Sequence, residues 1–142
     1  MSTHRQRFVR VLCVVLCLVA LCPNSLSQKK KKVQVFVKHQ GEDTVGVQVA
    51  FAIREALRRS EGYALGDDEA DTIIELVTAQ TGPGVSIASV VIIKKGDSPF
   101  CSFNLAHFVY SIGSLRIKDT GDDIVATLDK QVNEFSFLYT EH

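Results

Sequence analysis

The chain has 142 residues and carries 16 basic and 16 acidic side chains, so its formal net charge is zero. This length suits a single domain with one modest core. Residues 33–142 contain nine basic and sixteen acidic residues, which gives them a formal net charge of −7. An acidic body of this kind argues against a general nucleic-acid-binding protein, because phosphate contacts need a basic surface.

Residues 1–27 predict a cleaved signal peptide. Three arginines precede an unbroken apolar run over residues 11–22, and small residues at Ser25 and Ser27 mark a cleavage site after Ser27. The run of 12 apolar residues is shorter than the roughly 20 needed to cross a bilayer, although a membrane anchor made by uncleaved residues 11–22 is the alternative. A lipoprotein signal is disfavoured because Leu21, which is not small, precedes Cys22. We therefore expect a periplasmic or secreted protein.

Residues 28–32 predict a basic, disordered leader to the mature chain. Lys29, Lys30, Lys31 and Lys32 are consecutive, and a charged run without apolar residues resists ordering. The four lysines can make at most a weak contact with anionic lipid. The remainder, residues 33–142, contains no internal repeat and no linker, and predicts one α+β domain.

The first elements of this domain are predicted to be a strand and a helix. Apolar and polar residues alternate from Val33 to His39, which is typical of a strand with one buried face. From Thr44 to Ser60 the apolar residues recur at helical spacing. Glu55 and Arg59 form an i,i+4 pair on this helix, and Gly62 suits the left-handed position that ends it.

An acidic cluster comes before three further predicted strands. Carboxylates at positions 67, 68, 69 and 71 could bind calcium, but EF-hand spacing is missing and a solvated loop is the preferred interpretation. Strands are predicted over residues 70–81, 85–95 and 100–112, and the short connections between them favour antiparallel pairing. The β-branched run in residues 85–95 predicts a central strand that is buried on both faces.

A closing helix is predicted to open at Gly121-Asp122-Asp123, with an apolar stripe from Ile124 to Phe135. The predicted fold is therefore α+β in the order β-α-β-β-β-α, with a mixed four-stranded sheet and two helices packed on one face. The first two strands are separated by a helix and can lie parallel through a right-handed crossover.

Three segments of this pattern resemble the amino-terminal domain of TolB and similar periplasmic domains. They are the helix and turn VGVQVAFAIREALRRSEGYAL, the hairpin ADTIIELVTAQTGPGVSIASVVII and the closing helix DDIVATLDKQVNEF. In those domains a "gy-l" turn precedes a strand that starts with Ala-Asp, which Ala70-Asp71 matches. The resemblance covers roughly residues 33–138 and implies a non-catalytic interaction domain in the cell envelope. TolB also requires a propeller, which does not follow here, so its own role is not implied.

The candidate chemical groups are two histidines and one acid. His39, Asp43 and His107 could act together as acid and base or as metal ligands, which defines the alternative of a small periplasmic ligand-binding protein or hydrolase. No His-x-x-x-His, Cys-x-x-Cys or nucleophile-elbow spacing supports that alternative. Cys101 lies between phenylalanines at 100 and 103, which predicts a buried, inert thiol.

The predicted function is therefore that of a non-catalytic interaction or accessory domain that binds another envelope protein. We expect no catalytic residue, no cofactor, no metal and no nucleic-acid partner. The binding surface would be an exposed sheet edge or helix face. Apolar residues near the carboxyl terminus, at Phe137, Leu138 and Tyr139, are expected to be exposed.

Overall fold

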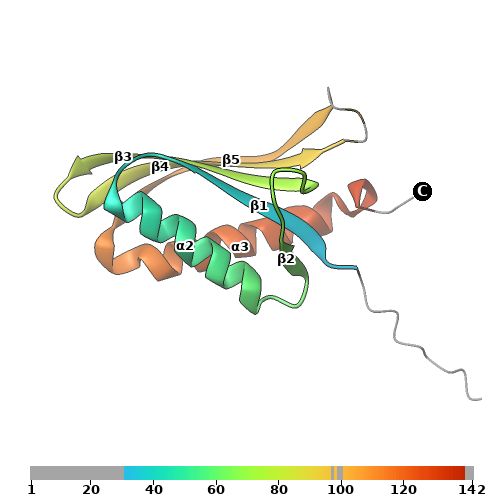
Figure 1. Cartoon of the computed structure of the whole chain (residues 1–142), viewed down its shortest axis with the longest axis horizontal. Coiled ribbons are helices and arrows are strands. Elements are labelled where there is room, and N and C mark those ends of the chain that lie inside the picture. The colour runs from blue at the N-terminus through green and yellow to red at the C-terminus, as the bar shows by residue number, and fades with distance from the viewer. Residues whose placement is uncertain (1–30, 97, 99–100, 140–142) are drawn as a thin grey trace, which may run out of the picture. The chain divides into compact units, whose positions relative to one another are not determined.

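The structure, a computed structural model, describes residues 31–96, 98 and 101–139, which form a sheet covered on one side by two helices (Figure 1). The predicted signal peptide and most of the basic leader lie outside the described residues. The elements in chain order are β1 (Val33–Gln40), α2 (Thr44–Arg59), β2 (Tyr63–Leu65), β3 (Thr72–Gly82), β4 (Val85–Lys95), β5 (Ser102–Gly113), η1 (Ser114–Arg116), α3 (Ile117–Glu134) and η2 (Ser136–Leu138). The α+β class is confirmed. Within the described part of the chain, neither helix combines the length and the hydropathy needed to span a bilayer.

The sheet has five strands in the order β2-β1-β3-β4-β5, so the predicted count of four is wrong by one. The parallel pairing of β1 with β3 and the antiparallel pairings of β3 with β4 and β4 with β5 are confirmed. The missed strand, β2, pairs parallel to the start of β1. Its three residues are too few to show an alternating pattern. Its first residue, Tyr63, is buried.

The core lies between the sheet and the two helices. Side chains of β1, β3 and β4 alternate between this buried side and an open side, and the fully buried ones include Val35, Ile74 and Val90. On β4 the even-numbered residues from Ser86 to Ile92 are buried, whereas Ile87 is 45% exposed. The prediction that this strand is buried on both faces is therefore wrong, because both helices pack on the same side of the sheet.

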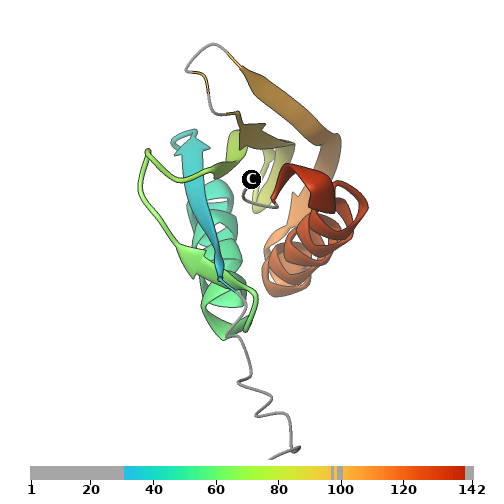
Figure 2. The same ribbon diagram turned by 90° about the vertical axis from the view of Figure 1, so that its right-hand side faces the viewer.

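The closing helix α3 begins at Ile117 rather than at Gly121. Gly121 is buried inside the helix, where a side-chain carbon would lie 2.9 Å from the Ala52 Cβ of α2. This glycine therefore marks the close contact of two helices and not a helix start. Figure 2 shows α2 and α3 side by side.

The end of α2 also differs from expectation. The helix ends at Ser60 in an extended conformation, and Gly62 is not among the described glycines with positive φ. Glu55 pairs with Arg58 instead of Arg59, whose guanidinium lies 2.6 Å from the Asp122 carboxylate of α3. The basic end of α2 is thus tied to the second helix.

Candidate functional site

A buried polar cluster surrounds the amino terminus of α2. Asp43 caps the helix and accepts a hydrogen bond of 2.6 Å from the Gly46 amide. Its carboxylate also accepts hydrogen bonds from the Ser86 hydroxyl of β4 at 2.6 Å and the Thr78 hydroxyl of β3 at 2.5 Å. A single carboxylate therefore fixes the start of the helix against two strands.

His39 joins this cluster through the same threonine. Its Nε2 lies 2.9 Å from the Thr78 Oγ1. Because the one hydroxyl proton of Thr78 is donated to Asp43, the imidazole Nε2 must donate to the oxygen. The histidine is therefore not placed to accept a proton from Thr78, as the base of a catalytic hydroxyl would be.

The protonation of both groups follows from these contacts. Burial alone would raise the pKa of Asp43, but the hydrogen bonds from Ser86, Thr78 and Gly46 outweigh it and hold the pKa below its ordinary value. Burial lowers the pKa of His39; the charge of Asp43 opposes this effect and the charge of Arg54 adds to it. The cluster therefore consists of an ionised acid and a neutral imidazole near neutral pH.

Two glycines on either side of Asp43 in the sequence pack closely against the Thr78 hydroxyl. Gly41 has a φ of +143°, a conformation that side chains rarely adopt, and a carbon added to it would lie 2.4 Å from the Thr78 Oγ1. A carbon added to Gly46 would lie 2.0 Å from the same atom. No space for a substrate adjoins the hydroxyl on this side, so the arrangement suits a structural role.

His107 is held apart from the other two candidates. It lies on β5 with its side chain on the open side of the sheet, where its Nε2 is 3.1 Å from the Ser89 hydroxyl. Thr78 and Ser86 point to the opposite, helix-covered side. The structure thus brings His39 and Asp43 together through Thr78 and excludes His107 from their cluster.

Thr78 and Ser86 were not identified from the sequence. Thr78 could have been noticed because it follows Ile74 and Leu76 on the same side of the strand. It is a polar residue at a position where the pattern predicts a buried aliphatic side chain. Such a residue needs a hydrogen-bonding partner when it is buried.

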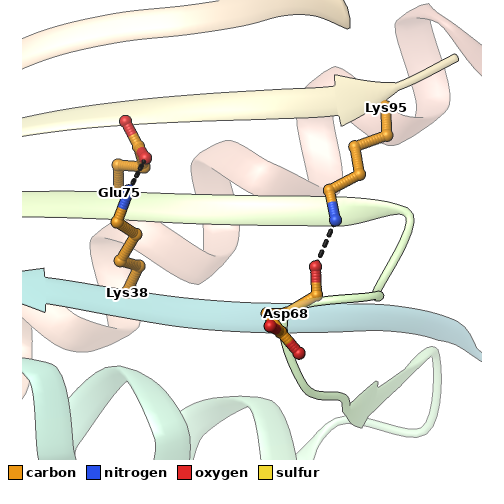
Figure 3. A network of polar contacts seen from close by, with 4 residues as sticks. All are labelled: Lys38, Asp68, Glu75 and Lys95. Carbon is orange, nitrogen blue, oxygen red and sulfur yellow. Dashed lines mark hydrogen bonds and ion pairs between the residues drawn. The ribbon is translucent and has the colours of Figure 1, made fainter. Parts of the chain in front are cut away.

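The acidic loop after β2 is held by lysines of β4. Lys95 donates a hydrogen bond to the main-chain oxygen of Asp68 (Figure 3), and the Lys94 ammonium lies 3.9 Å from the Asp71 carboxylate. Asp67 accepts a bond of 3.1 Å from the Glu69 amide. Among the described residues no group of three or more histidine, cysteine or acidic side chains is arranged to hold a metal ion.

The open side of the sheet carries exposed apolar side chains. Val77, Ile87 and Val109 are 48%, 45% and 63% exposed on three adjacent strands. Their registers place them close together, because Ser89 of β4 pairs with both Val77 and Val109, and Ile87 is two residues from Ser89. We call Val77, Ile87 and Val109 the apolar patch. On the β1 side of this face, Lys38 and Glu75 form an ion pair of 2.7 Å (Figure 3).

Two predicted positions outside these groups need correction. Cys101 is exposed rather than buried, because it precedes β5 instead of lying within it. Leu138 and Tyr139 pack against the core, whereas Phe137 is 66% exposed as expected. The Tyr139 hydroxyl lies 3.2 Å from the Thr72 Oγ1, which ties the carboxyl-terminal segment to β3.

Comparison with known proteins adds the fold alone. No family model and no curated protein matches the chain. Its structure is similar to that of the hypothetical protein CT253 from Chlamydia trachomatis, with a TM-score of 0.56 and 9% sequence identity over 73% of this chain and 99% of that one. A dodecameric PelC variant from Paraburkholderia phytofirmans gives a TM-score of 0.47 and 11% identity over 70% of this chain and 89% of that one. The resemblance to the TolB amino-terminal domain remains a prediction.

Proposed function

We propose that this chain is an exported, non-catalytic interaction domain of the cell envelope, and that it binds another envelope protein through the open side of its sheet. The observation that carries the proposal is the apolar patch of Val77, Ile87 and Val109 on three adjacent strands. Exposed apolar side chains that lie near one another on a sheet face often belong to a protein-binding surface, and here Ser89 lies between Val77 and Val109.

The alternative of a hydrolase or ligand-binding protein is less well supported. It needs His39, Asp43 and His107 in one site, but His107 lies on the other side of the sheet from the Asp43 cluster. The Asp43 carboxylate already accepts hydrogen bonds from a main-chain amide and two hydroxyls. These contacts support a role for the cluster in holding α2 in place.

The binding surface can be tested by affinity capture of a tagged chain from its native envelope. We expect a stoichiometric companion protein with the unmodified chain, and its loss in the double variant Val77→Thr/Ile87→Thr, which keeps β-branched side chains while adding polar groups. The matched control is Val47→Thr/Phe51→Thr, which alters two exposed apolar residues of α2 away from the open side. Equal capture by the wild type and the patch variant would contradict the proposed surface.

Export can be tested separately by intact mass spectrometry. The proposal predicts a mature protein in the envelope fraction whose mass corresponds to a chain that starts at Gln28. A full-length protein recovered from the cytosol would overturn the proposed location. A full-length protein in the membrane fraction would instead support the anchor over residues 11–22.

A further inference from the structure

The two edges of the sheet differ in their capacity to pair with another strand. At one edge, β2 has three residues, and the adjoining main-chain groups of β1 are already used. The Val35 carbonyl accepts a bond of 2.9 Å from the Gly66 amide, and the Val37 carbonyl accepts one of 2.8 Å from the Arg54 guanidinium. This edge is short and occupied, as protected edges of natural sheets are.

At the other edge, β5 runs for twelve residues and pairs only with β4 in the described part of the chain. Its register with β4 shifts between Ile92 and Ile93, but it is regular from Ala106 to Gly113. This strand contains no proline and no aspartate, glutamate, lysine or arginine. It therefore lacks the charges and prolines that commonly prevent an edge strand from pairing.

Apolar side chains flank this edge on both faces, together with the exposed polar residues His107 and Ser111 on the open side. Val109 is 63% exposed on the open side. On the helix side, Phe108 and Tyr110 are partly exposed and pack edge to face, with their ring centroids 5.2 Å apart. A strand that pairs here would cover these groups along with the main-chain donors and acceptors.

The absence of charged side chains from β5 makes a second copy of the chain a suitable partner strand, although the rest of the domain is acidic. The body from residue 33 onward has a balance of −7, so two copies repel wherever their acidic surfaces meet. The strand itself brings no charged side chain opposite its own copy. Antiparallel pairing about a twofold axis also gives each copy the same contact, as a closed symmetric dimer requires.

We propose that two copies of this chain dimerise by antiparallel pairing of their β5 edges over residues 106–113. Because each copy has only one edge that can pair, the assembly stops at two copies. The two sheets then form one continuous sheet across the twofold axis. The inference goes beyond the proposed function and needs neither export nor a companion protein. The dimer can therefore exist even if the capture experiment fails, and the reverse also holds.

The physical nature of this contact sets its expected strength. A single strand pair falls at the small end of specific interfaces, below about 1,200 Å² in total, so we expect a dissociation constant in the micromolar range.

The test is sedimentation equilibrium of the purified chain in reducing buffer, which removes any disulfide through Cys101. We expect a concentration-dependent dimer, and at least a roughly tenfold weaker one for Val109→Lys, because edge lysines oppose strand pairing. Ser111→Lys, at another exposed position of β5, should have the same effect. The matched control is Val77→Lys, which places the same charge on the same face but on the inner strand β3, and should leave the dimer intact.

Each other result overturns the proposal. A wild-type monomer throughout the range up to several hundred micromolar would exclude the dimer. An equal loss of dimer with Val77→Lys would place the contact on the sheet face instead of its edge. A dimer that survives both β5 lysines, when circular dichroism shows that the variants are folded, would exclude the strand. A monomer that captures an extended peptide at β5 would assign the edge to another protein.

Discussion

Asp43 connects three elements through one carboxylate, so its removal has consequences beyond the helix cap. We expect Asp43→Ala to lower the free energy of unfolding by about 2–4 kcal/mol, because a lost cap costs about 1 kcal/mol and the buried hydroxyls of Thr78 and Ser86 lose their acceptor. Urea unfolding measures the change. Glu42→Ala is the control, since Glu42 is exposed and should change stability by less than about 0.5 kcal/mol. A loss below about 1 kcal/mol for Asp43→Ala would show that the cluster contributes little.

His39 should make stability depend on pH in a separate window. Its pKa in the folded state lies below the ordinary value of 6.5, so the unfolded chain binds the proton more readily. This contribution to stability is complete above pH 6.5 and is lost as the pH falls through the folded-state pKa. Asp43, whose pKa is also lowered, loses its contribution only below its ordinary value of 3.8. We expect His39→Gln to remove the loss of stability that begins below pH 6.5 and to keep the loss that begins below pH 3.8. Urea unfolding at a series of pH values measures both.

Because the helix was predicted to begin at Thr44, the sequence already placed Asp43 directly before it. Its partners could not be predicted locally, because Thr78 and Ser86 are 35 and 43 residues away along the chain. Spacing rules describe neighbours within an element, whereas this cluster forms where three elements meet. The exposure of Cys101 was missed for a related reason: the aromatic residues around it do not decide where the strand begins.

At the scale of the elements, Gly121 determines how closely the two helices approach. Alanine is a better helix former by about 1 kcal/mol, yet a carbon at this position would lie 3.0 Å from the Ala52 main-chain carbon, which cannot move aside alone. We therefore expect Gly121→Ala to be destabilising by about 1–3 kcal/mol in thermal or urea unfolding. Gly113→Ala is the control, because an added carbon there meets nothing within 4 Å and φ is −88°. A stabilised Gly121→Ala variant would show that the helices can separate at little cost.

The two faces of β4 should respond differently to the same charge. Val90 is fully buried against the helices, so Val90→Asp leaves an unpaired charge in the core at a cost of several kcal/mol and should abolish cooperative unfolding. Val91 lies on the open side beside Glu75, and Val91→Asp should lower stability only modestly, by about 1 kcal/mol. Circular dichroism and thermal unfolding compare the two variants. Loss of the fold in both variants would contradict the assignment of Val91 to an open side of the sheet.

For the whole molecule, the order and class of the elements followed from periodicity and turn residues, and the parallel first pair followed from the helix between β1 and β3. The fifth strand did not follow, because β2 is recognisable only from its pairing with β1. The faces of β4 were also wrong, since a β-branched run fits a strand with one covered face as well as one with two. Local pattern thus predicts most of the elements, while the packing of distant segments determines which surfaces remain exposed.

The place of β1 inside the sheet affects the order in which the fold can form. Strands β3, β4 and β5 form a meander in which each strand pairs with the next along the chain, so these pairings close early. By contrast, Lys38 of β1 must meet Glu75 of β3 across 37 residues, with a longer loop to close. We therefore expect β1, which precedes the other strands of the sheet along the chain, to be among the last to dock. Such a delay would suit the export proposed above, because an exported chain must stay unfolded until it has passed through a translocation pore.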